Sequence, residues 1–278
     1  MSARPRVPGP RAGGTPAAGI GDPATRLRLR AYRNPLRLAV SAGLWRGAWY
    51  LVCYVFVTGW VLFALAFTAA TIAVMLAVTL AGIPLLAAAA GVVRGCANAE
   101  RWRLRQVLAG PVRGSYRPVT RRGIVAQATT RWRDPATWRD VAYLIGLWAP
   151  LFILDTVVLT GWLTFLSGIT LPAWYRFPRS DFSNGTSVHG VQLGYFPNGP
   201  HGAGGTGLYL DTLPKALLAA ACCLVLWLLF NYVLLITARA HATIARALLR
   251  PPPDPLAGAK QMLARPGPLP PLVPSPPP

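Results

Sequence analysis

The residue with the most unusual setting is Asp155, an acid within a long apolar run that begins near Ala142. Thirteen helical residues place its carboxyl roughly 20 Å into that run, at ~1.5 Å per residue. A carboxylate at the centre of a bilayer costs about 2.5–3.5 kcal/mol on insertion scales, so Asp155 should face other helices and be paired or protonated. The amide of Asn231 differs from it in depth by ~10 Å, which argues against direct contact. Asp155 is thus a candidate for sensing or proton-coupled chemistry, and the alternative is a hydrogen-bonded structural residue.

A second group of chemically active side chains lies in the segment 172–215, between the last two apolar runs. It contains two histidines and two acids that could titrate or bind a metal: Asp181, His189, His201 and Asp211. Their spacing matches no compact metal motif, so we predict neither a metal nor a cofactor. A segment of this length is either functional or disordered. We expect it to cover the helices as a lid, or to sense external pH or a small molecule.

The same segment contains a β-hairpin signature. Apolar and polar residues alternate in 188–196 and again in 207–211, on either side of a Gly- and Pro-rich stretch at 197–206. Such an alternation around turn residues predicts two paired strands.

Long apolar runs must position these side chains. The chain is 53% hydrophobic, has a mean hydropathy of +0.40 and carries a formal net charge of +20, with the charges concentrated between the runs. The 46 residues from Ala48 to Val93 contain no charge, and one helix of that length would reach roughly 70 Å, over twice the hydrocarbon core. Two helices with a turn near 68–71 fit better. We predict an all-α membrane protein with four transmembrane helices, at about 48–67, 72–93, 142–166 and 216–237.

The distribution of arginine and lysine predicts the orientation. Nine lie before residue 48, eleven in 94–141 and five after residue 237, but only three in 172–215. Because basic residues are retained on the cytoplasmic side, we expect both termini inside and 172–215 outside a bacterial plasma membrane. Residues 33–250 would form the membrane domain, flanked by disordered tails at 1–32 and 251–278. The Pro-rich C-terminal tail is interpreted as a solvated spacer, with an SH3-like partner as the alternative.

The two halves of the chain resemble each other. Arg33-Asn34-Pro35 and Arg133-Asp134-Pro135 precede the first and third runs, and Thr58-Gly59-Trp60 matches Thr160-Gly161-Trp162. This predicts two parallel-repeated hairpins, an arrangement found both in transporters and in plain bundles. A proline within the second run, in Gly82–Pro84, should kink that helix.

Arginines 94, 101, 103 and 105 alternate with apolar residues just after the second run. We expect this basic helix to lie along the anionic inner leaflet, with no nucleic-acid partner. Asp134 should cap the next helix, with Pro135 as its first residue. Trp138 should lie in an interfacial aromatic belt together with Trp45 and Trp49.

Five motifs occur in a characteristic order: residues 80–86 (LAGIPLL), 99–101 (AER), 115–118 (SYRP), 133–140 (RDPATWRD) and 211–217 (DTLPKAL). They resemble the "putative sensor" domain family of actinobacterial membrane proteins, often found ahead of histidine kinases in two-component systems. The resemblance implies a four-helix module that detects a signal and passes it on. The residues that carry it are Gly82, Pro84, Glu100, Arg101, Arg133, Asp134, Pro135, Trp138 and Asp140.

No catalytic motif is present, and only ~40 residues follow the last span, too few for a kinase module. We therefore expect no enzyme activity and a standalone sensor acting on a separate kinase or regulator. His241 is expected to face lipid headgroups, since a phosphoacceptor would need a kinase domain. The alternatives are a small transporter or channel subunit, favoured by the repeat and Asp155, and an envelope-assembly scaffold. The chain could also form a homo-oligomer.

Overall fold

The structure, a computed structural model, describes residues 26–76, 82–112, 114, 116–118, 123–181, 187–196, 198 and 204–250. Most of these residues are helical. In chain order the helical segments are α1 (Pro35–Ala39), α2 (Ala42–Cys53), η2 (Tyr54–Leu62), α3 (Phe63–Leu76), α4 (Gly82–Leu104), α5 (Ile124–Trp132), α6 (Pro135–Val141), η3 (Ala142–Gly146), α7 (Trp148–Ile169), α8 (Leu171–Trp174) and α9 (Leu213–Leu249). The strands are β1 (Arg179–Asp181), β2 (Ser187–His189), β3 (Val191–Tyr195) and β4 (Thr206–Leu210).

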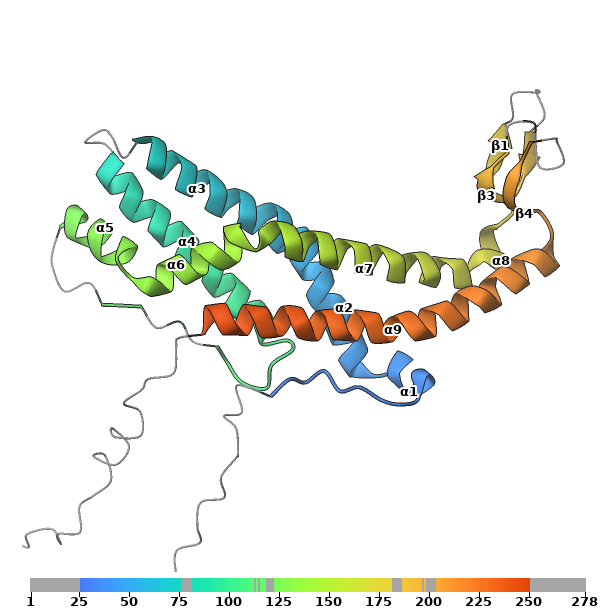
Figure 1. Cartoon of the computed structure of the whole chain (residues 1–278), viewed down its shortest axis with the longest axis horizontal. Coiled ribbons are helices and arrows are strands. Elements are labelled where there is room, and N and C mark those ends of the chain that lie inside the picture. Colours follow the sequence, from blue (N-terminus) through green and yellow to red (C-terminus); the bar gives the residue numbers. More distant parts are fainter. Residues whose placement is uncertain are drawn as a thin grey trace, which may run out of the picture.

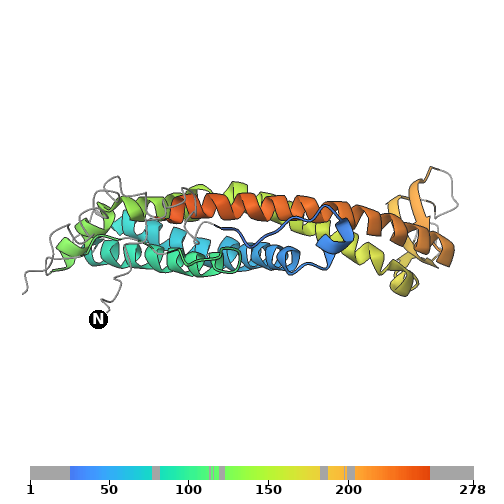
Figure 2. The ribbon, with the colours of Figure 1, turned by 90° about the horizontal axis from the view of Figure 1, so that it is seen from below.

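Two helix pairs make up the elongated molecule (Figures 1 and 2). The α3/α4 pair extends toward one end, with α5 and α6 beside α4. The α7/α9 pair extends toward the other end, where it carries α8 and the strands. Near the middle, α2 passes α9, and η2 passes α7.

Three helices are long and apolar enough to cross a membrane among the residues that the structure describes. They comprise Ala42–Met75 with 34 residues, Trp148–Ile169 with 22 and Leu213–Leu249 with 37. In the most apolar 18-residue stretch of each helix, only 33, 28 and 22%, respectively, is buried inside the protein. The remaining apolar surface is what a helix presents to lipid tails rather than to a protein core.

The predicted turn at 68–71 is wrong, because α3 runs through it without a break. Thr68, Ala69, Ala70 and Thr71 include no helix breaker, so no local signal ends the helix there. The prediction of four spans is not confirmed either. The fourth helix of substantial length, α4, carries Arg94 and Glu100 in its second half and does not qualify as a span.

The predicted kink at Gly82–Pro84 stays a prediction. The structure describes α4 from Gly82 to Leu104, and the residues at 77–81 lie outside the described part of the chain. If Gly82 is the first helical residue, Pro84 is tolerated because the first amides of a helix have no intrahelical partner.

The two helix pairs do not reproduce the predicted parallel repeat. They point toward opposite ends of the molecule, whereas both tips were expected on the same side (Figure 1). The matched motifs also have different surroundings: Thr58 is 2% exposed, while Thr160 lies on the surface. A Cβ at Gly59 would collide with the Phe152 ring. Its counterpart, Gly161, packs instead against Phe230 of α9, so equal sequence does not give equal packing.

The predicted hairpin is confirmed. β3 pairs with β4 in antiparallel register from Val191 with Leu210 to Tyr195 with Thr206. A second antiparallel pair, β1 with β2, was not predicted. Its strands have three residues each, too few to show a clear alternation.

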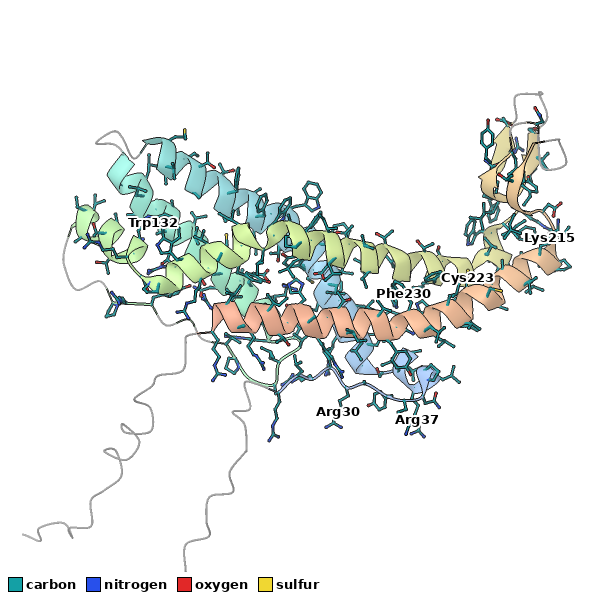
Figure 3. The ribbon with its side chains drawn as sticks, viewed as in Figure 1. Arg30, Arg37, Trp132, Lys215, Cys223 and Phe230 are labelled. Atoms are coloured by element: carbon teal, nitrogen blue, oxygen red, sulfur yellow. The ribbon has the colours of Figure 1, made fainter. Side chains whose placement is uncertain are left out.

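Close contact between α7 and α9 depends on glycine. Gly161 and Gly168 lie seven residues apart on α7, and each leaves room for a side chain of α9, Phe230 and Cys223 respectively. Figure 3 shows Phe230 and Cys223 between the two helices. Small residues of this kind let membrane helices approach closely, where packing rather than the hydrophobic effect drives association.

Gly168→Val should destabilise the protein, because its Cβ would overlap Cys223. Overpacking of this kind costs about 1–3 kcal/mol. Thermal unfolding in detergent should show a lower midpoint than for the native chain. Gly95→Ala is the matched control: nothing lies within 4 Å of its added Cβ, so it should be neutral or stabilise the protein by about 0.5–1 kcal/mol. Equal midpoints for the two variants would contradict this view of the α7/α9 contact.

Candidate functional site

Buried polar side chains gather where the two helix pairs meet. Six of them form one continuous set of contacts, which we call the junction network: Thr58, Glu100, Arg103, Tyr143, Asp155 and His241. They come from η2, α4, η3, α7 and α9, and all except Arg103, at 4%, are 2% exposed or less. Two of the six, Thr58 and Tyr143, lie in π-helical segments, which are frequent at functional sites.

Glu100 and Arg103 form the ionic half of the network. The Arg103 guanidinium donates to both carboxylate oxygens of Glu100, at 2.7 Å from Nη2 and at 3.0 and 3.2 Å from Nε. The hydroxyl of Thr58 also donates to Glu100. Arg103 Nη1 donates to the backbone carbonyl of Tyr50 at 2.8 Å, and its guanidinium lies over the Tyr50 ring. Both charges are therefore compensated by direct contacts, as burial requires.

Asp155 and His241 form the second half. His241 Nδ1 lies 2.6 Å from Asp155 Oδ2, and both residues are fully buried. The histidine ring makes edge contacts with Tyr50 and Tyr54. With Nδ1 facing a carboxylate, the proton of neutral His241 belongs on Nδ1, which leaves Nε2 as an acceptor.

Tyr143 joins the two halves. Its hydroxyl lies 3.1 Å from His241 Nε2 and 3.2 Å from Glu100 Oε2. A tyrosine hydroxyl has one proton, so it can donate to only one of these two acceptors at a time. A change in the protonation of His241 would therefore change which contact Tyr143 makes. Chemically, the network can store or pass a proton between Asp155 and Glu100.

The expectation that His241 faces lipid headgroups is wrong. Helix α9 continues without interruption to Leu249, and His241 lies on its inward face. Asp155 is paired, with this histidine as its partner. Asn231 forms no hydrogen bond with Asp155 in the described structure and accepts one from the Trp162 indole at 2.7 Å.

The arginines of α4 do not all face the leaflet as predicted. Arg101 pairs with Asp140 at 2.6 Å, and Arg94 pairs with Asp134 at 3.0 Å. Arg101 is only 5% exposed. These pairs hold α4 against α6. Asp140 of α6 and Asp134, its N-cap residue, each pair with an arginine of α4. Arg105, in contrast, is exposed.

Tyr116 and Leu249 make further contacts with the Arg101–Asp140 ion pair. The Tyr116 hydroxyl donates to Asp140 at 2.7 Å, and Arg101 Nε donates to the backbone carbonyl of Leu249 at 3.0 Å. Burial raises the pKa of Tyr116 to about 12, so its hydroxyl keeps its proton at physiological pH. Burial also raises the pKa of Asp140, while Arg101 and the Tyr116 hydrogen bond act in the opposite direction. The C-terminal end of α9 is thereby tied to α4 and α6.

The residues that carry the family resemblance have different environments. Glu100, Arg101, Asp134 and Asp140 are buried and ion-paired. Asp134 also caps α6 by accepting from Ala136 N, with Pro135 at the first helical position, which confirms both predictions. The remaining four lie away from these buried ion pairs: Arg133 and Trp138 are exposed, and Gly82 and Pro84 lie at the far end of α4.

The candidate residues of 172–215 are not brought together in the same way. His189 Nδ1 lies 3.0 Å from the Arg176 carbonyl, Asp211 pairs with Lys215 at 2.7 Å, and Asp181 is exposed in β1. His201 lies outside the described residues. Within the described part of the chain, no group of three or more His, Cys, Asp or Glu residues could hold a metal.

Sequence reasoning missed Thr58, Arg103 and Tyr143 as members of the site. The acid and base at Glu100 and Arg103 are three residues apart, which is the one local signal that could have suggested a pair. Thr58 and Tyr143 are unremarkable in sequence, and only the crossing of η2 and η3 over α4 brings them to Glu100.

Comparison with known protein families identifies a match. A family model described as "Putative sensor" matches residues 37–249, a range that includes both helix pairs and the whole junction network. Neither the curated proteins nor the solved structures contain a match to this chain.

Glu100→Gln should strongly destabilise the protein, because it leaves the buried charge of Arg103 without a counter-ion. Breaking a buried pair in this way costs about 3–5 kcal/mol. Lys215→Gln is the control: it removes one partner of an exposed pair and should cost less than about 1 kcal/mol. Thermal unfolding of both variants in the same detergent measures the difference. A loss for Glu100→Gln no greater than that for Lys215→Gln would show that the pair is dispensable.

Proposed function

Because this chain belongs to the "Putative sensor" family, we propose that it is a membrane sensor module that passes an external signal to a separate signalling protein. One observation carries the proposal: a single helix, α9, contacts the strand-bearing segment at one end and the junction network at the other. Segment 172–215 is the proposed outer side, in keeping with its three basic residues against eleven in 94–141.

The input end of α9 packs against a small apolar cluster. Ala216 is fully buried there together with Leu171, Tyr175 and Leu210. Leu210 is the last residue of β4, so the cluster links the strands to the first turn of α9. A ligand that shifts the strands would act on α9 through this contact.

The output end of α9 carries His241 and the carbonyl of Leu249. The helix has 37 residues, so its ends are about 55 Å apart at ~1.5 Å per residue. The His241 and Arg101 contacts are buried and have specific geometry, so a displaced helix must break them or exchange them for others. Such contacts favour discrete states over gradual deformation, which is the property a switch requires.

The proposed partner is a separate kinase or regulator that recognises the α5, α6 and α9 end. We expect affinity capture of the tagged full chain from native membranes, in mild detergent, to recover such a protein repeatedly. Recovery of no signalling protein in repeated captures would contradict the proposal.

Leu210→Ala tests transmission separately from partner binding. Leu210 is 5% exposed, and its truncation should loosen the contact with α9 and change the output of the captured partner several-fold, while capture itself continues. Leu208→Ala, on the same strand but 66% exposed, is the matched control and should leave the output unchanged. Equal effects of the two variants would mean that the strands do not act through α9.

Asp155 and His241 also favour a second function, a proton-coupled transporter or channel subunit. An ionisable pair in helices that can span a membrane is typical of ion and proton pathways. If this function holds, Asp155→Asn should abolish proton-dependent flux in proteoliposomes that contain only this chain. Absence of any flux with the native chain would eliminate this alternative.

A further inference from the structure

Residues 26–32 form an ordered strap, although they were predicted to belong to a disordered tail. In this strap arginine and leucine alternate as Arg26-Leu27-Arg28-Leu29-Arg30. Leu29 is 2% exposed, whereas all three arginines lie on the surface. An extended chain directs successive side chains to opposite faces, so the leucines hold the strap while the arginines form a basic row. Figure 3 shows Arg30 pointing away from the helices.

Backbone hydrogen bonds fix the strap in position. Arg28 N donates to the carbonyl of Val107 at 2.8 Å, and Ala109 N donates to the carbonyl of Arg26 at 2.9 Å. The guanidinium of Arg239, on α9, donates to the carbonyl of Leu29. The basic row is therefore held by α9 and by the residues that follow α4, which makes it a built surface of the fold.

Two adjoining open pockets, which we call cavities, lie between the strap and the start of α2, with volumes of about 540 and 450 Å³. Both are lined by Arg28 and Arg46; Arg26 and Arg30 line the smaller one, and Trp45 and Trp49 the larger. No acidic residue of the described part of the chain lines either cavity. Among the residues that the structure describes, no acid lies within ion-pair distance of these four arginines.

We infer that these cavities bind the phosphate headgroup of an anionic phospholipid of the phosphatidylglycerol class. Four arginines that form no ion pair with a described acid supply the charge and the paired N–H donors that phosphate oxygens prefer. The Gln106 amide, which lines the larger cavity, has a buried oxygen without a hydrogen-bond partner in the described residues. A hydroxyl on the headgroup would supply that missing donor.

Exposed aromatic side chains lie on α2 beside the larger cavity and on η2, the segment that follows α2. Trp45 and Trp49 are 48% and 59% exposed, and farther along Phe56 and Trp60 are 63% and 64% exposed. Tryptophans at this kind of position lie at membrane–water interfaces. A ligand with a phosphate head and an acyl tail satisfies both parts of this surface, whereas free phosphate satisfies only the first.

The test is a native mass spectrometry titration of the purified, delipidated full chain. The probes are short-chain phosphatidylglycerol and phosphatidylcholine, each with and without millimolar inorganic phosphate. We expect tighter binding of phosphatidylglycerol than of phosphatidylcholine, and no displacement by phosphate. The double variant Arg28→Gln/Arg46→Gln should weaken phosphatidylglycerol binding roughly thirty-fold, from the contribution of two basic residues near a membrane surface.

Three further variants control the experiment. Arg117→Gln/Arg133→Gln removes the same charge from exposed positions elsewhere and should leave the affinity unchanged within about two-fold. Arg28→Lys/Arg46→Lys should retain most of the affinity for phosphatidylglycerol. The single variant Arg30→Gln should bind this lipid roughly five-fold more weakly, and it provides a measurement if the double variant fails to fold. Equal affinity for the two lipids, equal loss in the control, or displacement by inorganic phosphate would each overturn the inference.

Discussion

The positive charge of Arg103 lies in the interior of a helical assembly, and most of the central packing follows from its compensation. Glu100 supplies the counter-charge one turn earlier on α4, but a single carboxylate leaves guanidinium N–H groups and its own lone pairs to be satisfied. The carbonyl of Tyr50 and the hydroxyls of Thr58 and Tyr143 meet those needs. Each comes from a different helical segment, so satisfying one ion pair brings α2, η2 and η3 against α4.

The second buried pair extends this constraint to α7 and α9. Asp155 and His241 contact each other directly through Oδ2 and Nδ1, and Tyr143 connects the histidine to Glu100. Around this polar centre the helices are apolar on their outer faces and packed through glycine where α7 meets α9. The protein thus combines outer surfaces suited to lipid with an interior whose contacts are directional. Directional contacts exist in a small number of arrangements, which is consistent with a sensor role.

The strap adds a different kind of constraint at the edge of the assembly. Its carbonyls accept from Arg239 on α9, so the basic row and the junction network share the same long helix. A lipid headgroup held by the strap would therefore contact a segment bound to α9. This arrangement would make the lipid composition of the leaflet one of the conditions under which α9 moves.

Sequence by itself determined the features that depend on composition and local pattern. Long apolar runs require a membrane or an equivalent apolar partner, alternating residues require strands, and the Asp134-Pro135 cap starts α6 wherever that helix lies. Only the tertiary structure decided the features that depend on which segments meet. The turn expected at 68–71 is absent, because an uncharged run shows that two helices are needed but not where the first one ends. The internal repeat is not confirmed, since the matched glycines contact different partners. Asp155 could be recognised as needing a partner, but His241 lies 86 residues away and was assigned to the lipid surface. The sequence shows which side chains carry charge. Which residues compensate a buried charge depends on the helices that pack around that charge, and only the tertiary structure shows this.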